Sequence, residues 1–352
     1  MGERAQGSVG FGFVGAGGIA QRALGPAVHA AAGAHLEAAA SRDPARAEAL
    51  GLAGKAYGSY DELLADPSVD VVYVALNNDA HRPWTLAALA AGKHVLCEKP
   101  LGLDPGEVEE MTAAAAAADR LLVEAFWYRW HPRTRRLEEL VAQGALGPLH
   151  AVEADFSFHG PREGDLATHY RLDPTRGGGA LYDVGCYSLS AAHAVLGPWL
   201  ALEDATADIG PTGVDLATHA QLRAPSGALA DVRGGIHGGD RQVLRVTGEA
   251  ASLEFSDPVF MSWHTPSSLT ITTPDGGVRV EEFAPVDPYA LMVEAVAARV
   301  RGESAFLVGL EHTAQVAASI DAIRRRLQGA GDGSGDGAGD GSGAAAGELG
   351  AP

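Results

Sequence analysis

The tripeptide Glu98-Lys99-Pro100 places an acid, a base and a proline directly after the apolar run from His94 to Cys97. The run reads as a buried strand, and ligands of open α/β sheets bind at the carboxyl ends of strands. Partial burial lowers the pKa of a lysine toward proton exchange, and a charged lysine polarises a carbonyl or holds an alcohol oxygen. Alone, the tripeptide would be better interpreted as a surface Glu–Lys pair.

A glycine-rich turn, Gly15-Ala16-Gly17-Gly18-Ile19-Ala20, follows the first apolar run and opens the first helical stretch. Gly15 allows a tight turn, Gly17 lets the backbone approach a pyrophosphate, and Ala20 is small enough for close helix packing. Free N–H groups at the helix start would face the anion. The context predicts a dinucleotide site, against the alternative of an ordinary glycine-rich turn.

The second apolar run ends in Ser41-Arg42-Asp43, and Ser41 lies 26 positions after Gly15. An NAD site usually has a carboxylate there for the ribose hydroxyls, whereas a hydroxyl and a guanidinium suit a 2′-phosphate. NADP is therefore favoured, with NAD as the alternative. The competing interpretation makes Arg42 a solvated surface residue and Asp43 only the cap of the helix at Pro44.

These residues require a sheet that brings strand ends together. Short apolar runs alternate with alanine-rich helical stretches up to about Ala125, which predicts a doubly wound parallel sheet covered by helices. The expected strands are Val9–Val14, His35–Ala40, Val69–Leu76, His94–Cys97 and Leu121–Ala125. The expected helices are Ile19–Ala32, Pro44–Leu50, Asp61–Ala65, Pro83–Ala91 and Pro105–Ala118.

After Pro132 one helical stretch runs to Gln143, and we interpret its Arg133, Arg135 and Arg136 as a solvated face. Alternating runs separated by turn signals then predict a large, mainly antiparallel open sheet. They are Ala151–Phe158, Leu216–Arg223, Ala228–Ile236, Val243–Thr247 and Leu269–Thr273, before helices at Tyr289–Arg301 and Glu311–Gln328. The expected fold is thus an N-terminal Rossmann domain, residues 1–125, and a C-terminal α+β domain, residues 126–328.

Composition excludes several classes of protein. The formal net charge of −19 counts against binding to nucleic acid or an anionic membrane. Two cysteines, Cys97 and Cys186, cannot form a disulfide framework and lack zinc spacing, so we expect no metal and a reducing compartment. No leader or membrane span is recognisable, which predicts a cytoplasmic protein. Residues 329–352 are Gly/Ala/Asp-rich and are expected to be a disordered tail.

Several ordered motifs resemble the glucose–fructose oxidoreductase, inositol dehydrogenase and rhizopine catabolism (Gfo/Idh/MocA) family. The resemblance runs from about Val9 to Gln328. It rests on the glycine turn, on Ser41-Arg42-Asp43, on Asn78 with His81, on the stretch from Ala90 to Leu101, on Glu124-Ala125-Phe126-Trp127-Tyr128-Arg129 and on the stretch from Gly177 to Tyr187.

The resemblance implies roles for individual residues. Lys99 matches the family's catalytic lysine, with Pro100 after a cis peptide, and Asp183 matches the aspartate that orients substrate and lysine. Tyr170-Arg171 matches a Trp-Arg pair that reaches the cofactor from the second domain, and the tyrosine is a departure. The implied cofactor contacts are Gly15, Gly17, Gly18, Ile19, Ala20, Ser41, Arg42, Leu76, Asn78, His81, Glu98, Lys99 and Arg171.

Tyr187 stands where many members have histidine, four residues after Asp183. With tyrosine the chain is more similar to the dihydrodiol dehydrogenase, D-xylose dehydrogenase and glucose–fructose oxidoreductase branch, which implies Tyr187 as proton donor or acceptor. A phenol beside a lysine cation is expected to have a lowered pKa. Without the resemblance, Tyr187 reads as a core aromatic. The cluster from Phe126 to His131 fits a substrate pocket or a packed domain junction equally well.

The expected activity is transfer of hydride between NADP(H) and a CH–OH or C=O carbon of a sugar or cyclic diol. Three alternatives stay open: a ketoreductase acting on a nucleotide-linked deoxysugar, a non-catalytic regulator that senses a dinucleotide or sugar, and a redox-assisted glycosidase. The open sheet also suggests a homodimer or homotetramer.

Overall fold

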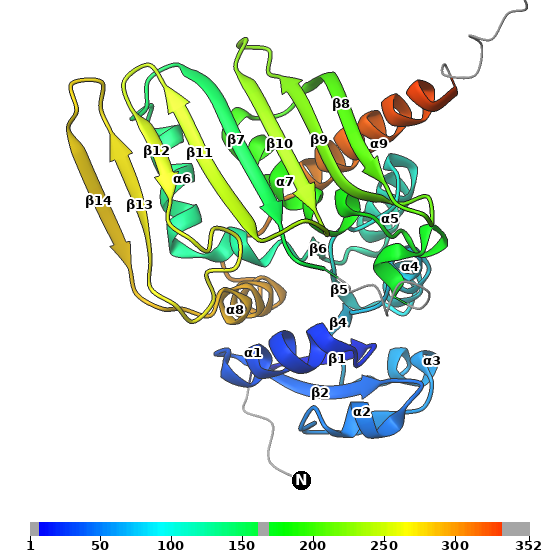
Figure 1. The fold of residues 1–352 in the computed structure, drawn as a ribbon. Coiled ribbons are helices and arrows are strands. Elements are labelled where there is room, and N and C mark those ends of the chain that lie inside the picture. The colour runs from blue at the N-terminus through cyan, green and yellow to red at the C-terminus, as the bar shows by residue number, and fades with distance from the viewer. Residues whose placement is uncertain (1–6, 161–168, 333–352) are drawn as a thin grey trace, which may run out of the picture.

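A computed structural model describes residues 7–160 and 169–332. Its strands form two sheets, one of six and one of eight strands. In Figure 1 the larger sheet lies above the smaller one, and helix α8 (Pro288–Val300) lies between them. The active-site residues predicted from the sequence therefore belong to two different sheets, and the question is where these sheets meet.

The six-stranded sheet is wholly parallel, with the order β3-β2-β1-β4-β5-β6. Its central strands β1 (Val9–Val14) and β4 (Val71–Val74) are buried along their whole length, as expected where helices cover both faces. From β1 the strand order runs to one side through β2 and β3 and to the other side through β4, β5 and β6. The carboxyl ends of β1 and β4 therefore flank the topological switch point, where ligands bind. The other strands are β2 (Ala34–Ala40), β3 (Ala56–Tyr57), β5 (His94–Cys97) and β6 (Leu122–Glu124), and the helices α2 (Pro44–Glu48), α3 (Tyr60–Leu64), α4 (His81–Ala90) and α5 (Pro105–Ala118). The predicted Rossmann sheet is confirmed.

The first helical stretch is not the single α-helix that the sequence predicted. After Gly18 and Ile19 it passes through a π-helical turn, η1 (Ala20–Leu24), and continues as α1 (Gly25–Ala30). Pro26 has no N–H to donate to the carbonyl one turn back, so a continuous α-helix would lose a hydrogen bond there. In the π-helical turn the Gly25 N–H instead bonds to the Ala20 carbonyl.

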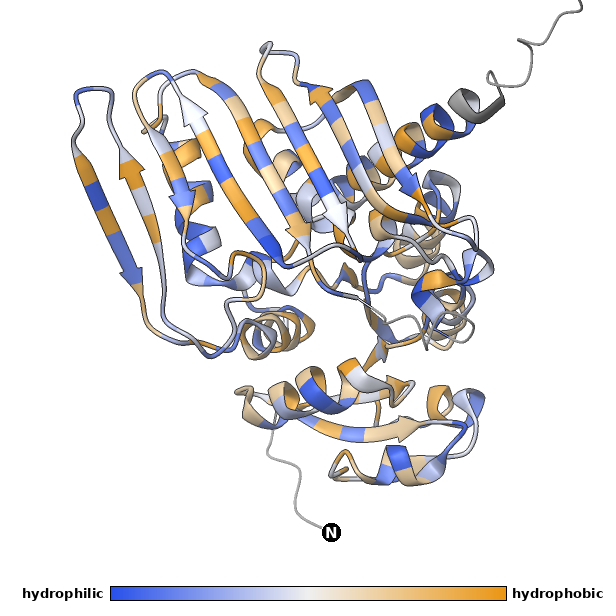
Figure 2. Ribbon diagram, in the orientation of Figure 1, coloured by the Kyte–Doolittle hydropathy of each residue, from blue (hydrophilic) through white to orange (hydrophobic). Residues whose placement is uncertain are grey.

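The eight-stranded sheet has the order β14-β13-β12-β11-β7-β10-β9-β8, and all of its pairs are antiparallel except β7 with β10. Its strands are β7 (Leu149–Ser157), β8 (Ala201–Ile209), β9 (Asp215–Arg223), β10 (Leu229–Gly235), β11 (Arg241–Gly248), β12 (Ser252–Phe255), β13 (Ser267–Thr272) and β14 (Val278–Phe283). Hydrophilic and hydrophobic residues alternate along several of them (Figure 2). The predicted mainly antiparallel sheet is confirmed, although the sequence missed β8, β12 and β14.

Helices α6 (Pro132–Ala142), α7 (Cys186–Leu196) and α9 (Leu310–Asp332) lie on one face of the large sheet (Figure 1). Both C-terminal helices also reach the Rossmann domain, because α8 packs against α1 and α9 packs against α5 and β6. Helix α9 runs past Gln328, where the sequence predicted its end. The remainder of the predicted disordered tail, residues 333–352, lies outside the described residues.

The interpretation of Arg133 as a solvated residue is wrong. Its side chain is 1% exposed, and its guanidinium donates hydrogen bonds to the segment from Ser256 to Ser262. Burial lowers the pKa of Arg133 to about 10. By contrast, Arg135 and Arg136 form surface ion pairs with Glu138 and Glu281. Helical periodicity puts the three arginines on neighbouring positions but does not reveal which of them a distant loop covers.

Within the described residues, no helix combines the length and apolar character needed to cross a membrane.

Candidate active site

Two adjoining cavities lie where the Rossmann sheet meets the second domain. The larger, of about 810 Å³, lies over the glycine turn, and the smaller, of about 370 Å³, contains Lys99, Asp183 and Tyr187. Both are within the range of roughly 300–1,000 Å³ typical of ligand pockets. They share lining residues from both domains: Ile19, Arg22, Leu76, Tyr170 and Arg171. The geometry therefore forms one continuous site with two compartments, which we name the cofactor cavity and the substrate cavity.

The glycine turn forms one end of the cofactor cavity. Gly15 has a φ of +100°, and a Cβ there would lie 2.6 Å from the Ala75 carbonyl oxygen, so both backbone conformation and space require glycine. A Cβ on Gly17 would meet no atom within 4 Å, so this backbone is open to the cavity. Gly18 and Ile19 also line it. Ala20 is fully buried and packs in the core, as the predicted packing role requires.

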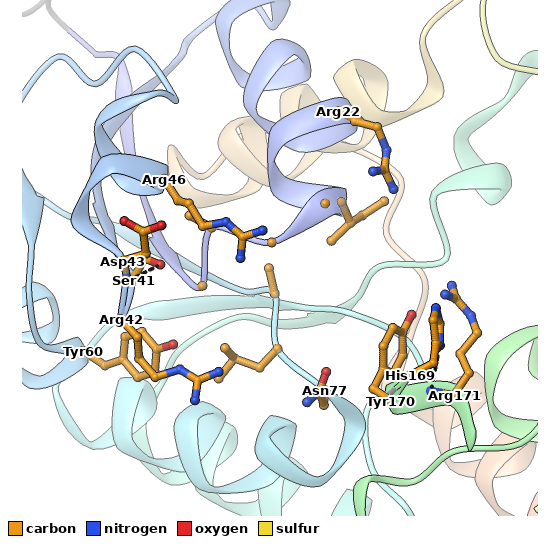
Figure 3. Close-up of a pocket in the computed structure, with 17 residues that line it drawn as sticks. Arg22, Ser41, Arg42, Asp43, Arg46, Tyr60, Asn77, His169, Tyr170 and Arg171 are labelled. Carbon is orange, nitrogen blue, oxygen red and sulfur yellow. Dashed lines mark hydrogen bonds between the residues drawn. The ribbon is translucent and has the colours of Figure 1, made fainter. Parts of the chain in front are cut away.

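Three arginines around the cofactor cavity, Arg22, Arg42 and Arg46, carry the charge expected of a phosphate site (Figure 3). Twenty-one ion pairs are found among the described residues, yet these three guanidiniums take part in none. In a protein with a net charge of −19, cations that lack a carboxylate partner indicate an anionic ligand. The cavity thus fits a dinucleotide with an additional phosphate.

Ser41 lines the same cavity, and its hydroxyl oxygen accepts the Asp43 N–H at 3.2 Å. The Asp43 carboxylate caps α2 by accepting from Ala45, as predicted from the following proline. Sequence reasoning missed Arg46. It lies four residues after Arg42, in the helix that begins at Pro44, and a second arginine so soon after Arg42 is the signal that could have identified it.

Leu76 lines both cavities, and Asn78 lines the substrate cavity while donating to the Gly177 carbonyl at 2.8 Å. His81 differs from the expectation that it contacts the cofactor. Its ring is fully buried, and its nitrogens lie 2.8 Å from the Pro100 carbonyl oxygen and 3.2 Å from that of Leu76. His81 thus braces the two segments that line the cavities without lining either.

Lys99 lies between β5 and the cis Lys99–Pro100 peptide, the isomer that the resemblance implied. Its ammonium group donates to the Asp183 carbonyl oxygen at 2.7 Å and lies 3.6 Å from the Asp183 carboxylate. Burial by itself would lower the pKa of Lys99, but the surrounding acidic groups, Asp183 foremost, together outweigh burial and raise the pKa. The predicted lowering is therefore wrong, because the sequence did not reveal how close the carboxylate lies. The raised pKa favours the charged form of Lys99.

Asp183 belongs to a π-helical turn, η7 (Leu181–Gly185), immediately before α7. Its second carboxylate oxygen accepts from the Arg171 guanidinium at 2.5 Å. Burial favours the neutral form of Asp183, but Lys99 and Arg171 outweigh it, and its pKa is lowered. The side chain is consequently an anion that holds two cations at the boundary between the cavities.

Tyr187 lies on α7 with its ring 5.0 Å from the Lys99 ammonium group. Trp127, in the short helix η3 (Trp127–Trp130), donates its indole N–H to the Tyr187 hydroxyl oxygen at 2.9 Å. Burial, and then the Glu98 charge, raise the pKa of Tyr187 well above its usual value. The predicted lowering is wrong, because desolvation of the phenolate and the nearby acid exceed any effect of Lys99.

Glu98 also lines the substrate cavity and accepts a 2.5 Å hydrogen bond from the Tyr73 hydroxyl.

The aromatic cluster after Ala125 serves both roles that the sequence left open. Trp127 lines the substrate cavity, whereas Phe126, Tyr128 and Trp130 are buried in the core. Tyr170 and Arg171, the pair predicted to reach the cofactor from the second domain, each line the cofactor cavity and the substrate cavity (Figure 3). The Arg171 guanidinium lies 4.7 Å from the centre of the Tyr170 ring.

Replacement of Trp127 by Phe is expected to shift the pH profile of alcohol oxidation. Trp127 stabilises the phenolate of Tyr187, so its loss raises the pKa of that phenol further. A proton-accepting phenolate then forms only at higher pH, and at pH 9 kcat/KM for oxidation falls about three- to tenfold. The rate of carbonyl reduction, which uses the protonated phenol, changes less.

Trp130→Phe is the matched control for this experiment. Trp130 belongs to the same helix and donates its indole N–H to the Phe306 carbonyl oxygen, away from the cavities. Its loss should leave the pH profile in place. An unshifted profile in Trp127→Phe would contradict the role assigned to the Trp127–Tyr187 hydrogen bond.

In the described part of the chain, no group of three or more His, Cys, Asp or Glu side chains is arranged to hold a metal ion.

Comparison with known proteins identifies both domains. Residues 9–126 match the model of an oxidoreductase family with an NAD-binding Rossmann fold (GFO_IDH_MocA), and residues 134–254 match the GFO/IDH/MocA C-terminal domain. A D-xylose 1-dehydrogenase (NADP⁺) of Haloferax volcanii is 41% identical over 318 residues, which cover 89% of this chain and 95% of the relative. A mouse trans-1,2-dihydrobenzene-1,2-diol dehydrogenase is 43% identical over 156 residues, which cover 43% of this chain and 44% of the relative.

Solved structures show the same architecture. A 3-ketoreductase of Actinomadura kijaniata, in complex with NADP and TDP-benzene, superposes with a TM-score of 0.83 at 28% identity, covering 91% of this chain and 98% of that one. An aldose–aldose oxidoreductase of Caulobacter crescentus superposes with a TM-score of 0.82 at 27% identity, covering 92% of this chain and 98% of that one. The resemblance drawn from the motifs is confirmed: the chain belongs to the Gfo/Idh/MocA family of oxidoreductases.

Proposed function

We propose that the protein is an NADP-dependent dehydrogenase that oxidises a CH–OH carbon of a small sugar or cyclic diol, or reduces the corresponding carbonyl. The observation that carries the proposal is the meeting of Lys99, Asp183 and Tyr187 in a cavity that is continuous with the cavity over the glycine turn. Groups that handle a proton thus adjoin the place where a dinucleotide fits.

NADP is the cofactor that the residues support. Arg42 and Arg46 line the cavity beside the Ser41 hydroxyl at the end of β2, where the adenosine ribose of a dinucleotide is bound in Rossmann domains. The Haloferax relative is named for NADP⁺, and the Actinomadura structure contains NADP. When bound, the nicotinamide accepts or donates the hydride.

Oxidation also removes the proton of the alcohol oxygen, and that task belongs to the protein. Trp127 occupies one lone pair of the Tyr187 oxygen, because an indole N–H only donates. In oxidation the phenolate form of Tyr187 keeps a free lone pair that accepts the alcohol proton. Lys99 remains a cation held by Asp183, so it stabilises the negative charge that develops on that oxygen. In reduction, Tyr187 returns the proton.

The substrate cavity supports a small ring as the substrate. At about 370 Å³ it is near the lower end of ligand pockets, and aromatic side chains form much of its wall: Trp127, Phe156, Phe158, Tyr170, Tyr187 and Tyr289. Aromatic faces pack against the C–H faces of sugar and cyclohexane rings, while the polar cluster meets the hydroxyl groups. The relatives named for D-xylose and for a cyclic diol agree with this chemistry.

The decisive experiment follows nicotinamide absorbance with purified full-length protein, NADP⁺ or NAD⁺, and a panel of aldoses, inositols and cyclic trans-diols. Turnover of at least one sugar or diol with NADP⁺ is the expected result. Absence of turnover across the panel, despite tight NADPH binding, would overturn the proposal.

A ketoreductase acting on a nucleotide-linked sugar is the second candidate, because the Actinomadura structure with NADP and TDP-benzene has the same fold. Such a substrate adds a diphosphate. Within the described lining of the substrate cavity, the cations are Arg22, Lys99 and Arg171, and Lys99 and Arg171 are already paired with Asp183. Reduction of a nucleotide-linked ketose, without turnover of free sugars, would favour this candidate.

A purely regulatory role would not require Lys99, Asp183 and Tyr187 together in one cavity. The homo-oligomeric state and the cytoplasmic location suggested by the sequence remain predictions.

A further inference from the structure

Gln242 is a polar residue of the substrate cavity that the proposed proton chemistry does not use. It lies near the start of β11 and lines the cavity together with Lys99 and Tyr187. Its side-chain oxygen accepts the backbone N–H of Phe260 at 2.7 Å and that of Met261 at 3.3 Å. Since only the oxygen of an amide accepts hydrogen bonds, these two donors fix which end of the side chain is the NH₂ group.

The NH₂ group has no hydrogen-bond acceptor among residues 7–160 and 169–329. The cavity that Gln242 lines has several apolar walls, which include Trp127, Phe158 and Phe156, the last directly opposite Gln242 in the β7–β11 pair. A ring substrate that fills this cavity displaces water from the wall. The Gln242 donor must then find an acceptor on the substrate or lose its hydrogen bonds altogether.

The segment that orients Gln242 is itself held rigidly. The Arg133 guanidinium donates to the Ser256 carbonyl at 2.8 Å, to the Pro258 carbonyl at 3.0 Å and to the Val259 carbonyl at 2.8 Å. Phe260 stacks on Phe156 with ring centres 5.3 Å apart and an interplanar angle of 14°. The two backbone donors that hold the Gln242 oxygen are therefore fixed before any ligand binds, and so is the direction of the NH₂ group.

We propose that Gln242 donates a hydrogen bond to a substrate hydroxyl other than the one that is oxidised. The site then selects ring compounds with at least two hydroxyl groups, such as cyclic diols and pentoses, over mono-alcohols of the same ring. A polar group built to bind a substrate hydroxyl discriminates strongly against an analogue that lacks it, because the group is left unpaired. This inference rests on the proposed dehydrogenase activity and adds a determinant of substrate specificity.

Gln242→Met removes the NH₂ donor, adds no charge and keeps an unbranched side chain of similar length. We expect kcat/KM for trans-cyclohexane-1,2-diol and for D-xylose to fall about 10- to 30-fold relative to kcat/KM for cyclohexanol, which lacks the second hydroxyl. Any loss that comes from the segment around Phe260, which also loses its acceptor, is shared by all three substrates and cancels in this ratio. Gln242→Glu would not serve, because a substrate hydroxyl can donate to the carboxylate. NADPH binding, followed by fluorescence, should be unchanged.

Equal losses on the diol and on cyclohexanol in Gln242→Met would overturn the inference, because the residue would then only shape the segment around Phe260. Unchanged kinetics on every substrate would overturn it as well, because no contact would be lost. Wild-type protein that oxidises none of the three probes, nor any other sugar or diol of the panel, would instead overturn the proposed function and, with it, this inference.

Discussion

Replacement of Lys99 by Met is expected to lower kcat for sugar or diol oxidation by about 100- to 10,000-fold, the range that a positioned acid–base or electrostatic group supplies. Methionine keeps an unbranched side chain of similar length but removes the ammonium group that lies 3.6 Å from the Asp183 carboxylate. The developing oxyanion then loses the Lys99 charge, and Asp183 retains only Arg171 as a cationic partner. The measurement is steady-state turnover with NADP⁺, together with NADPH binding, which should change only a few-fold.

Lys93→Met is the matched control. Lys93 is also buried, and its ammonium group donates to the carbonyl oxygens of Asp66 and Val69, neither of which lines the cofactor cavity or the substrate cavity. Its loss should lower the melting temperature and leave kcat within a few-fold of wild type. If Lys99→Met retained more than a tenth of the wild-type kcat, Lys99 would not be the group that stabilises the reacting oxygen.

Removal of both arginines beside Ser41, in the double variant Arg42→Ala/Arg46→Ala, is expected to reduce kcat/KM for NADP⁺ by about 100-fold or more. Each guanidinium is expected to form charge-assisted hydrogen bonds with the 2′-phosphate, worth about 1.5–3 kcal/mol apiece. NAD⁺ lacks that phosphate, so its kcat/KM should change less than threefold. The measurement is the ratio of kcat/KM for the two cofactors with one fixed substrate.

The same double variant also tests the alternative interpretation of Arg42 as a solvated surface residue. Arg82→Ala serves as a control for loss of a surface charge, since Arg82 pairs with Glu110 outside the cofactor cavity. A cofactor ratio that stays at the wild-type value in Arg42→Ala/Arg46→Ala would place the 2′-phosphate elsewhere or assign the enzyme to NAD⁺.

The parts of the site that local sequence chemistry determines were predictable. Gly15 has the positive φ that a tight turn after a strand demands, and Lys99 follows directly from the end of β5. The parallel sheet was recognisable because its central strands are continuous apolar runs. In the second sheet, β8 and β14 are edge strands with mostly exposed residues, so they lack the alternation by which a half-buried strand is recognised.

The electrostatics of the site could not be predicted, because they depend on residues that meet only after folding. Lys99 and Asp183 are 84 positions apart in the chain, and their proximity reverses the expected direction of the Lys99 pKa. Burial of Tyr187, together with the Glu98 charge, likewise reverses the expected direction of the pKa of that phenol. Arg133 was assigned to solvent because the segment that covers it begins more than 120 residues later.

Because the last helix, α9, packs against the Rossmann domain, that domain cannot complete its core early during synthesis on the ribosome. Ala317 of α9 packs into the same hydrophobic cluster as Val74, Cys97 and Met111 of the Rossmann domain. A growing chain of about 300 residues therefore holds a nearly finished nucleotide-binding domain whose apolar cover has not yet been synthesised. We expect the apolar surface under Ala317 and Leu310 to stay exposed to chaperones and to other nascent chains until α9 leaves the exit tunnel.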